Sequence, residues 1–453
     1  MKKELYENYF DGKNVTVLGL GLLGRGVGDT EFLLENVREV ICTDTRSEEI
    51  LEESVKEIKK NEWANLHLIL GENRLEDFEK RDFILTCTGL PRDYAPLVHA
   101  IKEGIPVYMS AALVVKILYE KMNDVKVIGV TGTRGKSTTT YLVHHLLTSA
   151  GKRVHLGGNI RGVANLPLLK DIEEGDYVVL ELDSWQLQGF KDLSICPHIA
   201  VFTSFLDDHL NYYKGDREAY FNDKAAIFIN QKMGDVIIAS PQAHAELSKR
   251  GYGDDVLVPT VSANSSSLIG THNEVNVALA FEVMKALGIT SSDAHKGLET
   301  FVAPEGRLQN LGDINGTIIY NDNNATTPDA VIAGIHGVTK AHAVKPIVIC
   351  GGTDKGLDLS DLERTLYEGT KEIIYISGTG TEKINLEKKF VYEKLGDCFK
   401  KALEESDTGD VILFAPGLAS FSSFKLYPVA LLRGNLVGKF ENLGFQVLLA
   451  KQS

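Results

Sequence analysis

Short apolar runs recur along the chain and alternate with longer segments of helical periodicity. The runs lie at 15–20, 39–44, 83–88, 125–130, 177–182, 198–204, 235–240, 317–322, 346–352, 372–377 and 410–416. Most positions within each run are apolar, so both faces of these strands are expected to be buried, as in parallel sheets covered by helices. The pattern therefore predicts an α/β fold.

Two helices are predicted together with their ends. The segment after Lys136 carries an apolar stripe from Leu142 to Ala150 and ends at Gly151, which suits a left-handed residue at a helix C-terminus. A second helix is predicted to open with a capping box at Thr271–Glu274 and to end at Gly288. Interruptions at 104–106 and 303–306 divide the pattern into three predicted domains, at 1–109, 110–307 and 308–453.

Composition narrows the function classes. The 62 acidic and 48 basic residues give a formal charge of -14, which opposes general attraction to DNA or to an acidic membrane surface. We therefore expect no nucleic-acid partner. The N-terminal segment is charged and polar, and no apolar stretch is long enough to span a membrane, so we expect a cytoplasmic protein without membrane insertion. The five cysteines are scattered singly, which fits a reducing compartment and argues against structural zinc.

The strongest chemical motif is Thr131–Thr138, between a predicted strand and a predicted helix. Its glycines allow backbone N–H groups to surround phosphate oxygens at a helix N-terminus, Lys136 can neutralise the outer phosphates, and Ser137 can bind magnesium. The strict phosphate-loop pattern would place a glycine where Val130 stands. The motif predicts ATP binding, and an ordinary Gly-rich turn is the alternative interpretation.

A second glycine motif, Gly19-x-Gly21-x-x-Gly24, follows the first strand, and Asp44 stands 20 residues after Gly24 at the end of the next strand. This is the dinucleotide fingerprint, so a nicotinamide-dependent dehydrogenase is the rival hypothesis. The same geometry holds the diphosphate of any nucleotide, and an ATP loop in the next domain favours a UDP-type ligand. A structural turn without a ligand is the third possibility.

Three further polar residues are candidates for the chemistry. Glu181 ends a buried strand, where a carboxylate beside a phosphate loop suits magnesium, which prefers oxygen ligands. His209 ends the segment Phe205-Leu-Asp-Asp-His209, and Lys224 follows Asp223, 15 residues after His209. Each also has an ordinary explanation, since Glu181 could be an edge carboxylate, His209 a helix cap and Lys224 a solvated lysine.

Taken together, these residues resemble the Mur ligase family, and the likeness runs the length of the chain. Thr131–Thr138 is similar to the family's T-G-T-x-G-K-[ST] loop, Gly158–Ile160 to its G-N-I segment, and Glu181–Leu187 to its E-L-S-S-F-Q-L. The resemblance implies a Rossmann-like N-terminal domain at 1–109 that binds a UDP-sugar. It also implies a central P-loop ATPase domain at 110–307 and a Rossmann-like C-terminal domain at 308–453 that binds an amino acid.

The resemblance further implies an activity, with its substrates and cofactors. The expected enzyme is a monomeric, ATP-dependent ligase that uses two Mg²⁺ ions. It would add D-glutamate to UDP-N-acetylmuramoyl-L-alanine through an acyl phosphate, a step of peptidoglycan precursor synthesis. Another amide ligase of the same superfamily, with a different amino acid or acceptor, is the alternative.

The resemblance assigns roles residue by residue. Catalysis and metal binding fall on Lys136, Ser137, Glu181, His209 and Lys224, with Lys224 carbamylated, because an ammonium would be repelled by a dication whereas a carbamate is an anionic oxygen ligand. The ATP-binding residues are Gly132, Thr133, Arg134, Gly135, Lys136, Ser137, Thr138, Asn273, Asn276, Arg307 and Asp322. The UDP-substrate residues are Gly19, Leu20, Gly21, Leu22, Asp44, Thr45, Arg46, Asn159, Ser184 and Gln186. The amino-acid residues are Thr326, Lys355, Ser420 and Phe421.

Several positions depart from the family pattern. Asn324 replaces the lysine of N-D-S-K-A-T, and Asp183 and Trp185 replace Ser and Phe. The usual S-P-G segment reads Thr88–Pro91, and the usual acidic start of the central domain reads Met109–Ala112. None of these positions is among the residues assigned to ATP or to the metal ions.

Overall fold

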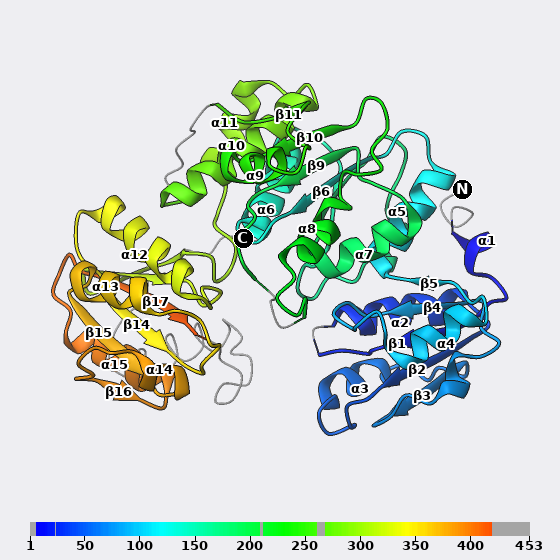
Figure 1. Cartoon of the computed structure of the whole chain (residues 1–453), viewed down its shortest axis with the longest axis horizontal. Coiled ribbons are helices and arrows are strands. Elements are labelled where there is room, and N and C mark those ends of the chain that lie inside the picture. Colours follow the sequence, from blue (N-terminus) through cyan, green and yellow to red (C-terminus); the bar gives the residue numbers. More distant parts are fainter. Residues whose placement is uncertain (1–5, 23, 209–211, 261–267, 419–453) are drawn as a thin grey trace. The chain divides into compact units, whose positions relative to one another are not determined.

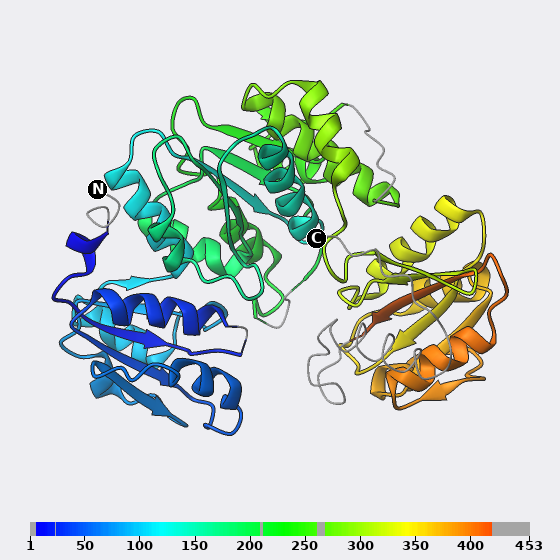
Figure 2. The same cartoon turned by 180° about the vertical axis from the view of Figure 1, so that it is seen from behind.

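The computed structural model describes residues 6–22, 24–208, 212–260 and 268–418 and contains three β-sheets, shown from two sides in Figures 1 and 2. The chain divides into two compact units, one formed by Met1–Val261 with Ala278–Leu298 and the other by Ser262–Val277 with Glu299–Ser453. Parallel strands alternate with helices in every sheet, so the predicted α/β class is confirmed. The boundaries of the three predicted domains stay a prediction.

The first sheet has the order β3-β2-β1-β4-β5, and all its strands are parallel. These strands are β1 (Asn14–Leu18), β2 (Glu39–Asp44), β3 (Leu66–Leu70), β4 (Phe83–Thr86) and β5 (Val107–Tyr108). The accompanying helices are α1 (Glu7–Phe10), α2 (Arg25–Asn36), α3 (Glu52–Ile58) and α4 (Ala95–Lys102). The strand order reverses at β1, and ligands of open α/β sheets bind beyond the carboxyl ends of the strands at such a reversal.

The central sheet has the order β11-β10-β9-β6-β8-β7 and is also parallel. Its strands are β6 (Lys126–Thr131), β7 (Val154–Gly158), β8 (Tyr177–Glu181), β9 (Ile199–Phe202), β10 (Val236–Ala239) and β11 (Val256–Leu257). Helices α5 (Ser110–Lys121), α6 (Lys136–Ser149), α7 (Ser184–Leu193), α8 (Arg217–Ala225) and α9 (Pro241–Ser248) connect them. They are followed by α10 (Thr271–Ala286) and α11 (Ser291–Thr300).

The two predicted helix ends are confirmed, because Gly151 and Gly288 follow α6 and α10 with φ of 74° and 71°. The predicted capping box is wrong by one position. Thr271 is already the first residue of α10, and the Gly270 carbonyl accepts a backbone hydrogen bond from Glu274 N–H at 3.2 Å. Gly270, with φ of 96°, therefore takes the position that the sequence pattern assigned to threonine.

The third sheet has the order β12-β13-β17-β14-β15-β16. It consists of β12 (Gln309–Ile314), β13 (Thr317–Asn321), β14 (Ile347–Gly351), β15 (Glu372–Ile376), β16 (Val391–Tyr392) and β17 (Val411–Gly417). Only the edge pair β12 and β13 is antiparallel among its described strands. Helices α12 (Pro328–His342), α13 (Ser360–Gly369), α14 (Thr379–Lys383) and α15 (Leu395–Glu404) complete it, with apolar clusters on both faces of the sheet. In the described part of the chain, no helix has the length and apolarity that crossing a bilayer requires.

Within the first unit, the first and central sheets share one continuous apolar core. A buried carboxylate lies at their junction. Oδ1 of Asp29, in α2, accepts hydrogen bonds from the backbone N–H groups of Asn165 and Leu166 at 2.9 and 2.8 Å. Burial raises the pKa of Asp29 from 3.8 to about 6, against the opposing effect of these hydrogen bonds.

This carboxylate predicts a pH dependence of stability. The folded state binds the Asp29 proton more tightly than the unfolded state, so its contribution is greatest below about pH 4 and is lost as the pH rises through about 6. Asp29→Asn keeps an oxygen that can accept both N–H bonds but cannot ionise. The free energy of unfolding of the variant, relative to wild type, should therefore rise between pH 4 and pH 7 by at most about 3 kcal/mol.

Denaturant unfolding of both proteins across this pH range measures the difference. Other titrating groups cancel because they are common to both proteins. A difference that stays constant with pH would show that Asp29 titrates normally.

Candidate active site

The phosphate loop lies between β6 and α6, as the sequence predicts. Gly132 has φ of 145°, and a Cβ there would overlap the side chain of Thr203. Gly135 adopts the left-handed conformation, with φ of 85°, directly before the first residue of α6. A side chain is excluded at Gly132 by lack of space and disfavoured at Gly135 by conformation, so the loop can turn tightly and present the N-terminus of α6 to an anion.

The segment that follows β9 holds this loop in place. Thr133 N–H donates to the Ser204 carbonyl at 2.7 Å, and Arg134 N–H donates to Ser204 Oγ at 2.8 Å. Thr133 Oγ1 also contacts the Tyr220 hydroxyl at 3.1 Å. The Arg134 guanidinium pairs with Asp208 at 3.2 Å. Sequence reasoning missed these supporting residues, although β9 was predicted as a strand and the carboxyl ends of parallel neighbours meet at one edge of a sheet.

Two lysines converge on the base of the loop. Lys136 Nζ donates to the carbonyls of Gly132 and Thr133 at 2.9 and 3.1 Å. Lys224 Nζ donates to the same Gly132 carbonyl at 2.8 Å, and the Lys224 side chain is only 1% exposed. Burial, with the Lys136 charge adding to it, lowers the pKa of Lys224 well below 10.5. Lys224 is therefore not a solvated surface lysine.

Glu181 lies beside the loop because of strand register. It ends β8, pairs with Val130 of β6 on one side and with Gly158 of β7 on the other, and is 4% exposed. Asn159 N–H donates to the Glu181 carbonyl at 2.7 Å. Ser137 stands in the first turn of α6, so the structure brings the phosphate loop, Glu181 and Lys224 to one edge of the central sheet.

Ser184 and Gln186, predicted to bind the UDP-substrate, lie in the first turn of α7 and are both buried. Gln186 closes a capping box with Asp183: Gln186 N–H donates to Asp183 Oδ1 at 2.8 Å, and Asp183 N–H donates to Gln186 Oε1 at 3.3 Å. The Asp183 substitution is thus compatible with a well-formed helix start.

The glycine fingerprint connects β1 to α2. A Cβ at Gly19 would lie 2.6 Å from Cys87 Sγ, so this position requires glycine. At the end of β2, Arg46 donates two side-chain hydrogen bonds to Asp44, at 2.9 and 2.7 Å, and Gly21 N–H donates a third at 3.3 Å. Burial raises the pKa of Asp44, but the hydrogen bonds from Arg46 and Gly21 outweigh it and the pKa is lowered.

The other predicted UDP-substrate residues differ in exposure. Leu20 is buried and could offer a ligand only its backbone, whereas Leu22 and Thr45 are exposed. Arg25 donates to Asn159 Oδ1 at 2.6 Å and so joins the start of α2 to the G-N-I segment of the central sheet. Arg25 was not predicted, although it is the first residue of the helix that follows the fingerprint.

In the second unit, several predicted residues gather around β13. Asp322 Oδ1 accepts a hydrogen bond at 3.0 Å from the N–H group of Leu308, the residue that follows Arg307. Burial raises the pKa of Asp322 to about 6. Lys355 Nζ donates to the Thr326 carbonyl at 2.9 Å. Asn324, where the family pattern has lysine, donates to the Gly306 carbonyl at 3.0 Å and ties down the segment before Arg307.

Asn273 and Asn276 form a buried pair in α10. Asn276 Nδ2 donates to Asn273 Oδ1 at 3.0 Å, and Asn273 Nδ2 donates to the Ile269 carbonyl at 2.9 Å. Three predicted residues, His209, Ser420 and Phe421, lie outside the described part of the chain.

The described residues offer limited material for a metal site. In these ranges no three His, Cys, Asp or Glu side chains gather closely enough to hold a metal ion. Glu181 and Ser137 supply oxygen atoms, which suit magnesium. A magnesium ion held by these two groups would complete its coordination with water and with oxygens of a bound triphosphate.

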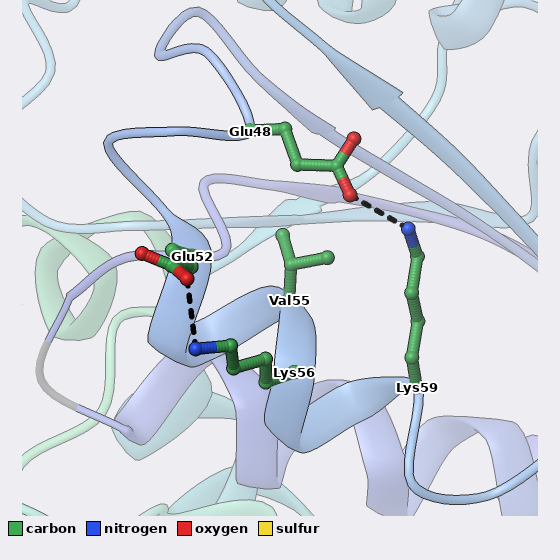
Figure 3. A pocket seen from close by; sticks show the side chains of 5 residues that line it. All are labelled: Glu48, Glu52, Val55, Lys56 and Lys59. Atoms are coloured by element: carbon green, nitrogen blue, oxygen red, sulfur yellow. Dashed lines mark hydrogen bonds and ion pairs between the residues drawn. The ribbon is translucent and has the colours of Figure 1, made fainter.

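A shallow pocket on α3 is unrelated to these motifs. Its lining residues are Glu48, Glu52, Val55, Lys56 and Lys59 (Figure 3). Four of these residues form two surface ion pairs, Glu48 with Lys59 and Glu52 with Lys56, each at 2.8 Å. None of the predicted site residues lines it.

The chain is similar in sequence to known proteins along most of its length. Residues 130–284 match the Mur ligase middle domain family. The chain is 31% identical to UDP-N-acetylmuramoylalanine–D-glutamate ligase of Borreliella afzelii, with 91% of this chain and 94% of the relative covered. A protein of the same name from Koribacter versatilis is 30% identical, with 92% and 95% covered.

Solved structures support the fold. The UDP-N-acetylmuramate–alanine ligase MurC of Thermotoga maritima superposes with a TM-score of 0.63 at 16% identity, covering 95% of this chain and all of the other. The MurF ligase of Thermotoga maritima in complex with ADP gives 0.58 at 17% identity, covering 91% and 93%. At these identities the likeness concerns the fold alone.

The predicted family resemblance is therefore confirmed by relatives that span almost the whole chain. The phosphate loop, the G-N-I segment and Glu181 occupy one edge of the central sheet, inside or beside the matched middle domain. The chain belongs to the Mur ligase family, the ATP-dependent ligases of peptidoglycan synthesis, in the group named UDP-N-acetylmuramoylalanine–D-glutamate ligases.

Proposed function

We propose that the protein joins D-glutamate to UDP-N-acetylmuramoyl-L-alanine and converts ATP to ADP and phosphate in the same reaction. The observation that carries the proposal is the convergence of Lys136, Lys224 and Glu181 on the phosphate loop, in a chain whose relatives bear this ligase name. An amide-forming ligase needs such a site, because a carboxylate must be activated before an amine can displace its oxygen.

The proposed reaction has two chemical steps. A carboxylate oxygen of the UDP-substrate attacks the γ-phosphorus of ATP, so that a C–O–P linkage forms and ADP leaves. The amino nitrogen of D-glutamate then attacks the acyl phosphate carbon, loses a proton and expels inorganic phosphate. Lys136 and the N-terminus of α6 would hold the phosphate oxygens during the first step, when two anions must approach each other.

Magnesium fits the oxygen donors at this edge. Ser137, Glu181, His209 and carbamylated Lys224 would hold two ions, and bound magnesium would offset the negative charge of the triphosphate. The chain's own residues position these oxygens, since the register of β8 with β6 sets Glu181 beside the loop.

Carbamylation of Lys224 is part of the proposal. A neutral lysine nitrogen can bond to the carbon of CO₂ and release a proton, which leaves an anionic carbamate with two oxygens. The lowered pKa of Lys224, caused first by burial, favours the neutral amine that this addition needs. The position of Nζ at the Gly132 carbonyl supports a carbamate directed at the phosphate loop.

The first sheet is proposed to bind the UDP group at the fingerprint. The Asp44 carboxylate is engaged by Arg46 and Gly21, which leaves it less available for the ribose hydroxyls of a nicotinamide dinucleotide and places a cation beside the glycine loop. This supports a UDP ligand over the dehydrogenase alternative.

We further propose the three domains at 1–109, 110–307 and 308–453, a cytoplasmic location and a monomeric state.

The third domain is proposed to bind the amino acid. Lys355 and Thr326, joined by a hydrogen bond, would contact a carboxylate of D-glutamate, together with Ser420 and Phe421. Asp322, Arg307, Asn273 and Asn276 would contact the nucleoside and phosphates of ATP.

Lys136→Ala should reduce ATP-dependent ligation about 100-fold or more, because it removes the charge that faces the outer phosphates. Phosphate release with UDP-N-acetylmuramoyl-L-alanine and D-glutamate measures the loss. Lys152→Ala is the matched control, since Lys152 is exposed just beyond the other end of α6. Near-normal turnover of Lys136→Ala would remove the loop from the mechanism.

Lys224→Ala should be nearly inactive and partly rescued by short carboxylates, which can replace the carbamate oxygens. Lys224→Arg should be inactive and not rescued, because guanidinium stays charged and does not add CO₂. Thermal unfolding checks that both variants fold, and ¹³C-labelled bicarbonate should give a carbamate NMR signal in the wild type alone. Substantial activity of Lys224→Arg would mean that the site needs positive charge, against the carbamate.

Lys355→Ala should raise the KM for D-glutamate about tenfold or more while leaving the KM for ATP unchanged, since a hydrogen bond between charged groups is lost. Lys389→Ala is the control, because it removes an exposed ion pair with Glu372, the first residue of β15 in the third sheet. An unchanged KM for D-glutamate would place the amino acid elsewhere.

A further inference from the structure

A chain of buried hydrogen bonds connects α2 of the first sheet to the G-N-I segment of the central sheet. It begins at Asp29, whose Oδ1 accepts the backbone N–H groups of Asn165 and Leu166. Asn165 is the N-cap and Leu166 the first residue of a short 3₁₀ helix, Leu166–Lys170, so Asp29 holds the start of a helix that lies between β7 and β8 of the central sheet. All of these residues belong to the first compact unit.

Asn165 continues the connection with its side chain, which is 2% exposed. Its Oδ1 accepts from Gly158 N–H at 2.7 Å, and its Nδ2 donates to Ser110 Oγ at 3.0 Å, at the first residue of α5. The amide thus uses both its acceptor and its donor. A carboxylate or an apolar side chain could not make the same pair of bonds.

Gly158 and Asn159 carry the connection to the proposed site. Gly158 has φ of 86°, and a Cβ there would overlap the Glu181 carbonyl oxygen, so the segment is pressed against the end of β8. Asn159 N–H donates to that same carbonyl at 2.7 Å, while the Asn159 side chain accepts from Arg25. The segment Gly158-Asn159 therefore contacts both Arg25, which follows the glycine fingerprint, and the carbonyl of Glu181.

Other contacts hold α2 on the central sheet without involving the site. Glu35 forms an exposed ion pair with Lys170, and Gly28 packs against Ala164. Attachment of the two sheets therefore does not by itself require a buried amide that binds Gly158 N–H.

We propose that Asn165, held by Asp29, is a positioning residue for the ligase reaction. By binding Gly158 N–H it sets the place of Asn159, and of the Glu181 backbone, relative to the start of α2. The inference rests on the proposed function, in which Glu181 holds a metal ion, and on the assignment of Asn159 to the UDP-substrate that the family resemblance implies. Neither Asn165 nor Asp29 touches a substrate in this account.

The test is a set of steady-state measurements on the full-length protein. Asn165→Ala and Asp29→Ala should each raise the KM for UDP-N-acetylmuramoyl-L-alanine about tenfold, while the KM for D-glutamate stays within about twofold of wild type. Asp29→Asn, which keeps the acceptor oxygen, should stay close to wild type. Glu35→Gln removes the exposed ion pair between the same elements and should leave all constants unchanged.

A merely structural role gives a different pattern. Loss of folded protein would lower the apparent kcat in proportion to the folded fraction, measured by thermal unfolding, and leave both KM values unchanged, and that result would overturn the proposal. Equal increases in KM for the UDP-substrate and D-glutamate would overturn it too, as would an effect of Glu35→Gln as large as that of Asn165→Ala.

A second readout is independent of ligase activity. Amide hydrogen exchange of Gly158 in the free protein should be at least tenfold faster in Asn165→Ala and nearly unchanged in Asp29→Asn. If the wild type lacks ligase activity, the proposed function fails, and exchange at Gly158 still reports whether Asn165 holds the segment. Unchanged exchange in Asn165→Ala would overturn the positioning role whatever the activity.

Discussion

The parallel pairing of β6 with β8 is the constraint on which the site depends. It sets Val130 beside Glu181, so that the strand leading into the phosphate loop and the strand ending in a buried carboxylate finish at one edge. Such an edge would repel a triphosphate if the carboxylate stood alone. Lys136 and the N-terminus of α6 lie at the same edge and supply the opposing charge, and the buried Lys224 lies beside them. Fold and chemistry are therefore fixed by the same strand register.

The central strands and both glycine loops could be predicted from sequence because each has a local physical cause. Buried parallel strands need nearly continuous apolar runs, and Gly132 and Gly135 occupy conformations or spaces that side chains do not tolerate. The strands missed were β3, β5, β7, β11, β12 and β16. All six are edge strands of the described sheets, and β5, β11 and β16 are only two residues long. The edge strand β12 reads Gln-Asn-Leu-Gly-Asp-Ile, a half-exposed pattern without an apolar run.

The supports of the site could not be predicted, because they depend on contacts between residues far apart in sequence. Lys224 reads as a surface helix lysine, and only the packing of α8 shows that it is buried at the Gly132 carbonyl. Asn165 lies in a loop without a motif, and its role appears only when Asp29 and Gly158 are seen beside it. Asn324 departs from the family pattern, yet its amide bonds the Gly306 carbonyl, a use that a motif comparison does not reveal.

We propose that the edge of the central sheet that carries the phosphate loop, Glu181 and Lys224 activates a carboxylate for amide formation with D-glutamate. The most direct measurement is product analysis by mass spectrometry after incubation with ATP, magnesium, UDP-N-acetylmuramoyl-L-alanine and, one at a time, a panel of D- and L-amino acids. We expect one new amide, formed with D-glutamate, in amounts equal to the phosphate released. Phosphate release without an amide, or an amide formed with another amino acid in preference to D-glutamate, would contradict it.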